Sequence, residues 1–166
     1  DLGMSRKHTR NIINIGKPLT LAFLPYAPDV KTMANEASQR GHELIIHMPM
    51  EPLNSKVSTG PIALKDNMTP EQVSENLTKA FESFDDYVGL NNHMGSRVTQ
   101  NEAILTQLMA QLKSRGLFFV DSVTTPKSIA YDTAREAGLA YAKRDIFLDH
   151  YEDIASIRKS IRRLER

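Results

Sequence analysis

Apolar residues along this chain alternate between short runs of strand length and longer segments with helical spacing. The short runs end at a proline, glycine or polar residue, and the longer ones tend to start at a capping residue. We predict strands at residues 19–24, 44–47, 87–91, 117–121, 140–143 and 145–148. We predict helices at residues 5–16, 29–40, 69–84, 101–115, 128–137 and 152–165. This alternation predicts βαβ units around a parallel sheet, either open or closed into a barrel.

The predicted helix starts rest on local signals. Ser5, Asp29 and Thr69 are expected N-caps, and Pro70 follows Thr69 at the first helical position. Between the second strand and the third helix, residues 48–67 contain three prolines and few periodic apolar positions. A loop of this length is usually functional or mobile, so we expect it to form a wall of a cleft.

Composition narrows the class of protein without naming a function. The chain has 166 residues, 40% hydrophobic and 25% charged, which fits a single globular domain spanning residues 1–166. Its net charge is +1, which gives no reason to expect nucleic acid as a partner, and we interpret the basic segment 156–166 as a solvated helix face. No apolar run approaches the ~20 residues of a transmembrane helix. With no cysteine, the chain has no disulfide, thiolate ligand or cysteine nucleophile.

Polar side chains gather where the predicted strands end. In parallel α/β folds the carboxyl ends of strands meet at one edge, which is where sites form. Asp1 joins this edge if a strand lies just upstream of it. The other residues expected at the edge are Pro25, Tyr26, His47, Asn92, His93, Asp121, Ser122, Asp149 and His150.

His47 and His93 fall at equivalent places in successive βα units. Each is either a core histidine bonded to a backbone carbonyl or a metal ligand. Two neutral imidazoles and a carboxylate leave a coordination position for water, as hydrolytic zinc requires. Glu51 is a structural loop carboxylate, a ligand, or a general base beside the metal-bound water.

The remaining candidates each have a structural and a functional interpretation. Asn92 either bonds a polar substrate such as a sugar or caps its loop, and Ser96 follows a glycine in a tight turn that can face the site. Arg97 binds a carboxylate or forms a surface ion pair. A buried Asp121 needs partners, which favours a role in or beside the site. Asp149 and His150 are candidate general acids, although Asp149 equally fits a helix N-cap.

Several segments together resemble the divergent polysaccharide deacetylases, distant relatives of the chitin and peptidoglycan deacetylases. They are LAFLPYAP at 21–28, GHELIIHMPMEP at 41–52, NHMGS at 92–96, FFVDS at 118–122, RDIFLDH at 144–150 and the initial DLG. The resemblance covers nearly the whole chain. It implies a distorted (β/α) barrel, truncated at both ends of this chain, with one metal ion, usually zinc or another divalent metal. It also implies hydrolysis of an N-acetyl group on a glycan, in the periplasm or outside the cell.

The resemblance also assigns roles to individual residues. Asp1 is similar to the second aspartate of the family's first motif, a metal ligand, and the first aspartate, the base, would precede it. His47 matches the first histidine of the next motif, whereas Glu51 stands where a second histidine is expected. His93 supplies the missing ligand, and Asp121 and His150 fall near the later motifs.

We therefore expect Asp1, His47 and His93 to hold the metal. Catalytic roles are expected for Glu51, Asp121 and His150, and substrate contacts for Asn92, Ser96 and Arg97. The alternative is a catalytically inactive deacetylase-like module that binds glycan or an envelope partner, which the changed second motif favours. A phosphoester hydrolase ranks last, because the chain has no Gly-rich phosphate loop.

Overall fold

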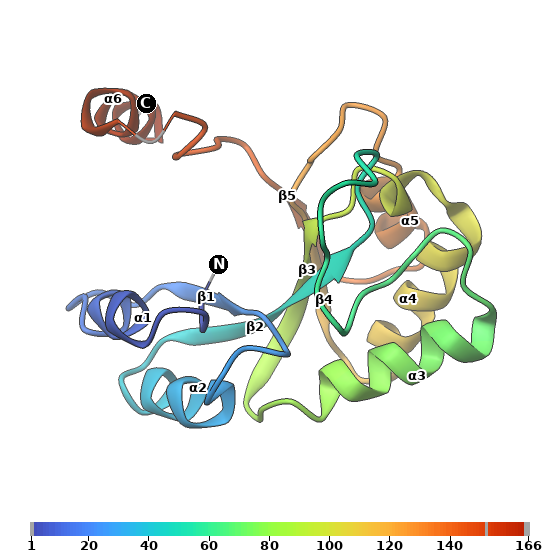
Figure 1. Ribbon diagram of the computed structural model, residues 1–166, viewed down its shortest axis with the longest axis horizontal. Helices are drawn as coiled ribbons and strands as arrows, with labels where there is room; N and C mark the ends of the chain where they lie inside the picture. The colour runs from blue at the N-terminus through green and yellow to red at the C-terminus, as the bar shows by residue number, and fades with distance from the viewer. Residues whose placement is uncertain (1, 152, 165–166) are drawn as a thin grey trace.

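A computed structural model describes residues 2–151 and 153–164. A parallel sheet runs through these residues, and its strands lie side by side in chain order (Figure 1). The strands are β1 (Thr20–Phe23), β2 (Glu43–Met50), β3 (Tyr87–Met94), β4 (Phe118–Asp121) and β5 (Tyr141–Lys143). Leu2 adds a parallel bridge to Phe23 at the β1 edge.

Helices separate the strands. Those described are α1 (Arg6–Ile13), α2 (Val30–Gln39), α3 (Pro70–Phe81), α4 (Glu102–Ser114), α5 (Ala130–Glu136) and α6 (Ile154–Leu164), with a 3-10 turn η1 at Val98–Gln100. From α1 to α5 they follow one another around one side of the sheet, while α6 stands apart from the body (Figure 1). None of the described helices is both long and apolar enough to cross a membrane.

The strand order distinguishes between the two architectures expected for βαβ units. A doubly wound sheet reverses its strand order at a switch point, whereas a (β/α) barrel adds each strand beside the previous one. The order β1-β2-β3-β4-β5 contains no reversal. The predicted α/β class is therefore confirmed, and the winding is that of a barrel-type fold.

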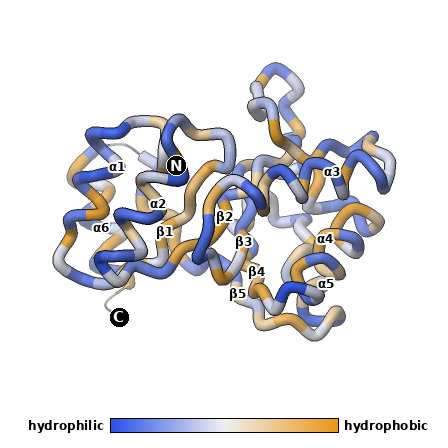
Figure 2. Tube along the Cα trace, turned by 90° about the horizontal axis from the view of Figure 1, so that it is seen from below, coloured by the Kyte–Doolittle hydropathy of each residue, from blue (hydrophilic) through white to orange (hydrophobic). Residues whose placement is uncertain are grey.

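Successive side chains of each strand point to opposite faces of the sheet, one packed against the helices and the other facing a cleft. Phe23, Ile46 and Phe119 are fully buried and belong to the core beneath the helices. Their neighbours Ala22 and His47 line a cleft instead. Figure 2 shows hydrophobic residues concentrated along the strands and on parts of the flanking helices. The core thus fixes which side chains of each strand are available for chemistry.

All three expected residues take the N-cap position of their helices, and two of them make a side-chain cap bond. Ser5 accepts from the backbone N–H of His8, and Thr69 forms a capping box with Gln72. Asp29 is the N-cap of α2, but its φ is 55° and its side chain makes no cap bond. It instead forms an ion pair with Arg6.

The strand predictions need three corrections. Strand β3 does not end at Asn91 but continues to Met94, so Asn92 and His93 lie within it. Residues 145–148 form no strand, and Phe147 and Leu148 are exposed there. Strand β2 does not end at His47 but continues to Met50, although Pro49 cannot donate a hydrogen bond. The last pairing between β1 and β2 is Phe23 with Ile46, so Pro49 lies beyond that ladder and interrupts none of its bonds.

Gly3 provides a test of how the first segment is held against the sheet. Its φ is +104°, and a Cβ there would lie 2.4 Å from the Cβ of Ala27. We expect Gly3→Ala to lower the free energy of unfolding by about 2–4 kcal/mol, because it adds both overlap and an unfavourable backbone conformation. Urea denaturation of both proteins measures the difference.

Gly16→Ala is the matched control, because no atom outside its neighbours lies within 4 Å of its Cβ position and its φ is not in the left-handed range. It should leave stability nearly unchanged. Equal effects of the two substitutions would contradict the proposed packing of Gly3 on Ala27.

Candidate functional site

The C-terminal ends of the strands open into a cleft of about 590 Å³. Its wall combines two histidines with amide, hydroxyl, guanidinium and carboxylate groups. The lining residues are Leu2, Ala22, His47, Asn91, Asn92, His93, Met94, Ser122, Thr124, Arg144, Phe147 and Asp149. Apart from Leu2, they come from β1, β2 and β3 and from the segments after β4 and β5. Of the described residues predicted at this edge, the lining includes His47, Asn92, His93, Ser122 and Asp149 but not Pro25, Tyr26, Asp121 or His150.

His47 and His93 lie side by side in the cleft. Nε2 of His47 is 3.1 Å from Nδ1 of His93, and the ring centroids are 4.9 Å apart. Nδ1 of His47 is 2.8 Å from the side-chain oxygen of Asn91. Because an amide oxygen only accepts, Asn91 fixes the proton of a neutral His47 on Nδ1 and leaves a lone pair on Nε2.

Burial determines the charge of this pair. It lowers the pKa of His47 to about 3, although the hydrogen bond that His47 donates to Asn91 opposes the shift and the charge of His93 adds to it. Burial also lowers the pKa of His93. Both imidazoles are therefore neutral at pH 7, which is the form that binds metals.

The spacing of the histidine nitrogens fits a shared metal ion. Two nitrogen ligands bound tetrahedrally at ~2.05 Å from zinc lie about 3.3 Å apart. The 3.1 Å between Nε2 of His47 and Nδ1 of His93 is close to this value. Among residues 2–151 and 153–164, no group of three or more His, Cys, Asp or Glu could hold a metal. The expected third ligand, Asp1, lies outside the described residues.

Asn92 joins the loops that follow β3 and β4. Its side chain is fully buried, donating to the carbonyl of Met94 and accepting from the backbone N–H of Ser122. The Ser122 hydroxyl in turn donates to the carbonyl of Asn92 at 2.7 Å. Asn92 therefore shapes the floor of the cleft, with its amide bonded to the protein at both ends.

Asp121 is buried, with relative exposure of 2%, and both of its carboxylate oxygens have partners. One accepts from the N–H of Val123 and the other from the Ser128 hydroxyl. It does not line the cleft. Asp121 thus holds the loop between β4 and α5 and supports the site from behind.

Arg144 lines the cleft but is absent from the predicted site residues. Its Nε donates to the carbonyl of Ser122 and its Nη2 to that of Val123, at 2.7 and 2.9 Å. Val123 has a φ of 46°, a costly conformation for a β-branched residue. An arginine directly after β5, at the same edge as the histidines, is the sequence signal that could have identified it.

Glu51, Ser96 and Arg97 lie in a separate cluster that does not line the cleft. Glu51 accepts from the N–H of Asp66 at 2.8 Å and lies 3.6 Å from Nε of Arg97, an ion-pair distance too long for a hydrogen bond. Ser96 accepts from the N–H of Leu53. These contacts attach the long loop to the turn after β3. None of residues 48–67 lines the cleft, so the expected cleft wall is not found in this loop.

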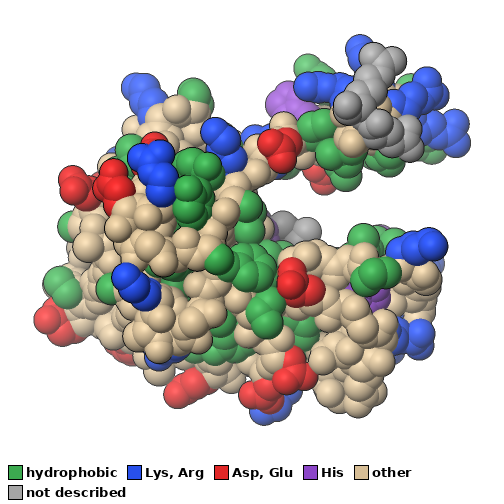
Figure 3. All heavy atoms as spheres, turned by 180° about the vertical axis from the view of Figure 1, so that it is seen from behind, with side chains coloured by type: hydrophobic (Ala, Val, Ile, Leu, Met, Phe, Trp, Pro, Cys, Tyr) green, Lys and Arg blue, Asp and Glu red, His purple; other side chains and the backbone are tan. Residues whose placement is uncertain are grey.

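The two expected general acids, Asp149 and His150, lie next to each other after β5 but face different surroundings. Asp149 lines the cleft, whereas His150 is exposed and packs edge-on against Tyr151 and Phe147. Figure 3 shows the molecule hollowed between this segment with α6 and the body. Of the two residues, Asp149 is the one positioned to face a ligand.

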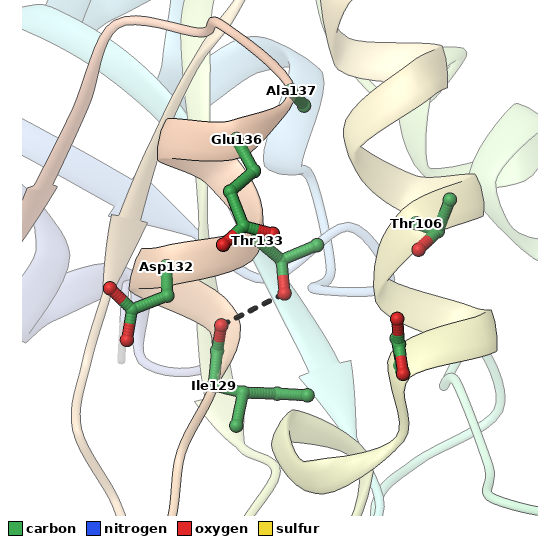
Figure 4. A pocket seen from close by; sticks show the side chains of 7 residues that line it. Thr106, Ile129, Asp132, Thr133, Glu136 and Ala137 are labelled. Atoms are coloured by element: carbon green, nitrogen blue, oxygen red, sulfur yellow. Dashed lines mark hydrogen bonds between the residues drawn. The ribbon is translucent and has the colours of Figure 1, made fainter.

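A second pocket, of about 450 Å³, lies between α4 and α5 (Figure 4). It contains the carboxylates of Glu102, Asp132 and Glu136 and no histidine. Asp132 is paired with Arg135, and the Thr133 hydroxyl donates to the carbonyl of Ile129 within the helix. These contacts are those of an ordinary helix surface, which leaves the histidine cleft as the candidate site.

Sequence comparison identifies relatives along nearly the whole chain. A sequence model described as "Divergent polysaccharide deacetylase" matches residues 1–166. An uncharacterized protein of Haemophilus influenzae is 34% identical over 163 residues, and the uncharacterized protein YibQ of Escherichia coli is 32% identical over 163 residues. The alignments cover 98% of this chain but only 58% and 51% of these relatives, so the chain spans little more than half their length.

A solved structure has the same fold. The crystal structure of uncharacterized protein ATU2773 from Agrobacterium tumefaciens C58 matches with a TM-score of 0.95 at 24% identity. The match covers 100% of this chain and 68% of that one. Such a score over the full chain supports the architecture described above.

The depressed pKa of His47 predicts a pH-dependent stability of the metal-free protein. The folded state keeps His47 neutral down to a pKa of about 3, whereas the unfolded chain takes up a proton as pH falls through about 6.5. Stability is therefore lost as the pH falls below about 6.5. Between pH 7 and pH 5 this site contributes a loss of up to about 2 kcal/mol.

Urea unfolding of chelator-treated protein at several pH values measures this loss. His47→Gln should flatten the dependence between pH 7 and pH 5, whereas His8→Gln, at an exposed position in α1, should not. An unchanged pH dependence in His47→Gln would show that another group causes it.

Proposed function

The chain belongs to the divergent polysaccharide deacetylase family, and we propose that it is a zinc-dependent hydrolase of N-acetyl groups on a cell-envelope polysaccharide or related glycan. The observation that carries this proposal is the histidine pair in the open cleft, with its nitrogens 3.1 Å apart. Burial keeps both imidazoles neutral, as zinc binding requires. A glycan of the cell envelope as substrate places the protein in the periplasm or outside the cell.

His47, His93 and Asp1 would hold the metal. The chemistry that zinc would supply there is activation of a water molecule and polarisation of the acetyl carbonyl. Asn91 acts behind His47, since its side-chain oxygen keeps the His47 proton on Nδ1 and directs Nε2 toward the ligand. His93 would carry its own proton on Nε2, so that Nδ1 can bind as well.

Proton transfer needs a carboxylate in the cleft. Of the described lining residues, Asp149 is the one with a carboxylate, and we assign it the transfer of a proton to the leaving nitrogen. Glu51 and His150 stay candidates only through movement of their segments, because neither lines the cleft. Asp121 and Asn92 hold the two loops, while Ser96 and Arg97 attach the long loop outside the cleft and make no contact that a bound sugar would need.

A binding module without turnover is the alternative. The observation that favours it is Glu51, which stands where the related deacetylases have a second histidine and is attached to Asp66 and Arg97. In that case the cleft would bind an acetylated glycan without turning it over. Metal content and acetate release together separate the two functions.

We expect the purified full-length protein to contain close to one zinc ion per chain by elemental analysis. His47→Ala and His93→Ala should each lower zinc affinity by roughly a hundredfold or more, since each removes one of three protein ligands. His8→Ala is the matched control, because His8 is an exposed helix residue. If the wild-type protein stays free of metal after zinc is supplied, the proposed zinc-dependent hydrolysis is contradicted.

Acetate release from acetylated glycans then tests turnover. We expect release by zinc-loaded wild-type protein and a loss of at least roughly a hundredfold in His47→Ala, because the metal supplies both the nucleophile and the oxyanion stabilisation. Zinc binding without acetate release from any acetylated envelope glycan would favour the binding module.

A further inference from the structure

Some N–H groups of the Arg144 guanidinium have no acceptor in the described structure. An arginine carries five N–H groups. One, on Nε, bonds to the carbonyl of Ser122, and one, on Nη2, to that of Val123. No acceptor among the described residues takes the other three. The Arg144 side chain also lies over the Phe147 ring, 5.0 Å from its centroid, which limits its movement.

Arg144 lines the cleft without a carboxylate partner, unlike four arginines elsewhere in the described chain. Arg6, Arg10, Arg97 and Arg135 each lie within ion-pair distance of an aspartate or glutamate. Within the described part of the chain no carboxylate lies within 4.0 Å of Arg144, although it is half-buried and its position is fixed by two carbonyls. Its positive charge is therefore uncompensated by a contact and faces the cleft.

The position of Arg144 suits a substituent close to the reacting group. Arg144 follows β5, but its guanidinium reaches back to the carbonyls after β4. Strand β4 is the neighbour of β3, which carries His93, and adjacent strands lie about 4.8 Å apart. A ligand that reaches the histidines can therefore contact the guanidinium with a neighbouring substituent of the same sugar unit.

The charged groups beside Arg144 favour an anion with a single negative charge. Apart from the two histidines, the charged side chains among the described lining residues are Arg144 and Asp149, which have opposite signs. A carboxylate matches the planar fork of an arginine, whereas a phosphate would bring a second negative charge near Asp149. A neutral substituent would leave the guanidinium uncompensated.

We propose that Arg144 is a specificity-determining residue that binds a carboxylate on the substrate, so that the cleft selects an acetylated sugar bearing a carboxylate next to the acetamido group. The acetamido group enters this proposal only because the proposed function is its hydrolysis. Binding of the carboxylate by Arg144 does not require that the protein hydrolyses the ligand.

The test compares two ligands that differ only in charge, N-acetylmuramic acid and its methyl ester, by calorimetric or NMR titration of the zinc-loaded full-length protein. We expect the acid to bind roughly tenfold or more tightly than the ester. Arg144→Gln should bring this ratio close to one, and Arg144→Lys should restore part of it. Arg135→Gln, on the surface of α5, is the matched control and should keep the wild-type ratio.

The ratio distinguishes recognition from a merely structural role. If Arg144 only supports the loop at Val123, its loss weakens both ligands alike and the ratio stays unchanged. An unchanged ratio in Arg144→Gln, equal affinities in wild type, or no measurable binding of either ligand would each overturn the proposal. If the ratio of the two affinities depends on Arg144 but no acetate is released, the carboxylate site is supported and the hydrolase function is contradicted.

Discussion

The pairing of β2 with β3 is the constraint on which the site depends. It places His47 beside Asn91 and Pro49 beside His93 in one register. Because side chains alternate between the faces of a sheet, a slip of one residue would turn a histidine toward the helices and an apolar side chain toward the cleft. The buried residues Ile46, Met48 and Leu90 oppose such a slip, since it would expose them. Packing of the helix-facing side chains thus determines which side chains of β2 and β3 face the cleft.

The same packing sets the electrostatics of the cleft. A histidine within a strand of the sheet is partly removed from water, which penalises its charged form. In His47 this burial outweighs the hydrogen bond to Asn91, which acts in the opposite direction. The His47 imidazole therefore stays neutral, with its proton on Nδ1 and a lone pair on Nε2. This arrangement is unfavourable for an ion pair but suits a metal ligand.

Much of this architecture could be predicted from local signals in the sequence. The alternation of apolar runs and helical segments gives the α/β class, and residues at strand ends include both histidines and Asn92. Contacts between distant segments could not be predicted in this way. The attachment of Glu51 to Asp66 depends on how the long loop folds back, and Pro49 hid the continuation of β2. Residues 145–148 look like a strand by composition but form no strand, and of the four only Ile146 is partly buried.

Arg144 illustrates why site residues are the hardest part to predict. Nothing in RDIFLDH shows that its side chain turns back across β4 to the carbonyls of Ser122 and Val123. Val123 keeps a positive φ, and the loop holding it is supported by Asp121 on one side and Arg144 on the other. A group that contacts Arg144 in the cleft therefore acts on the same side chain that holds this strained turn. Ligand recognition and the shape of the cleft floor are in this way coupled through one guanidinium.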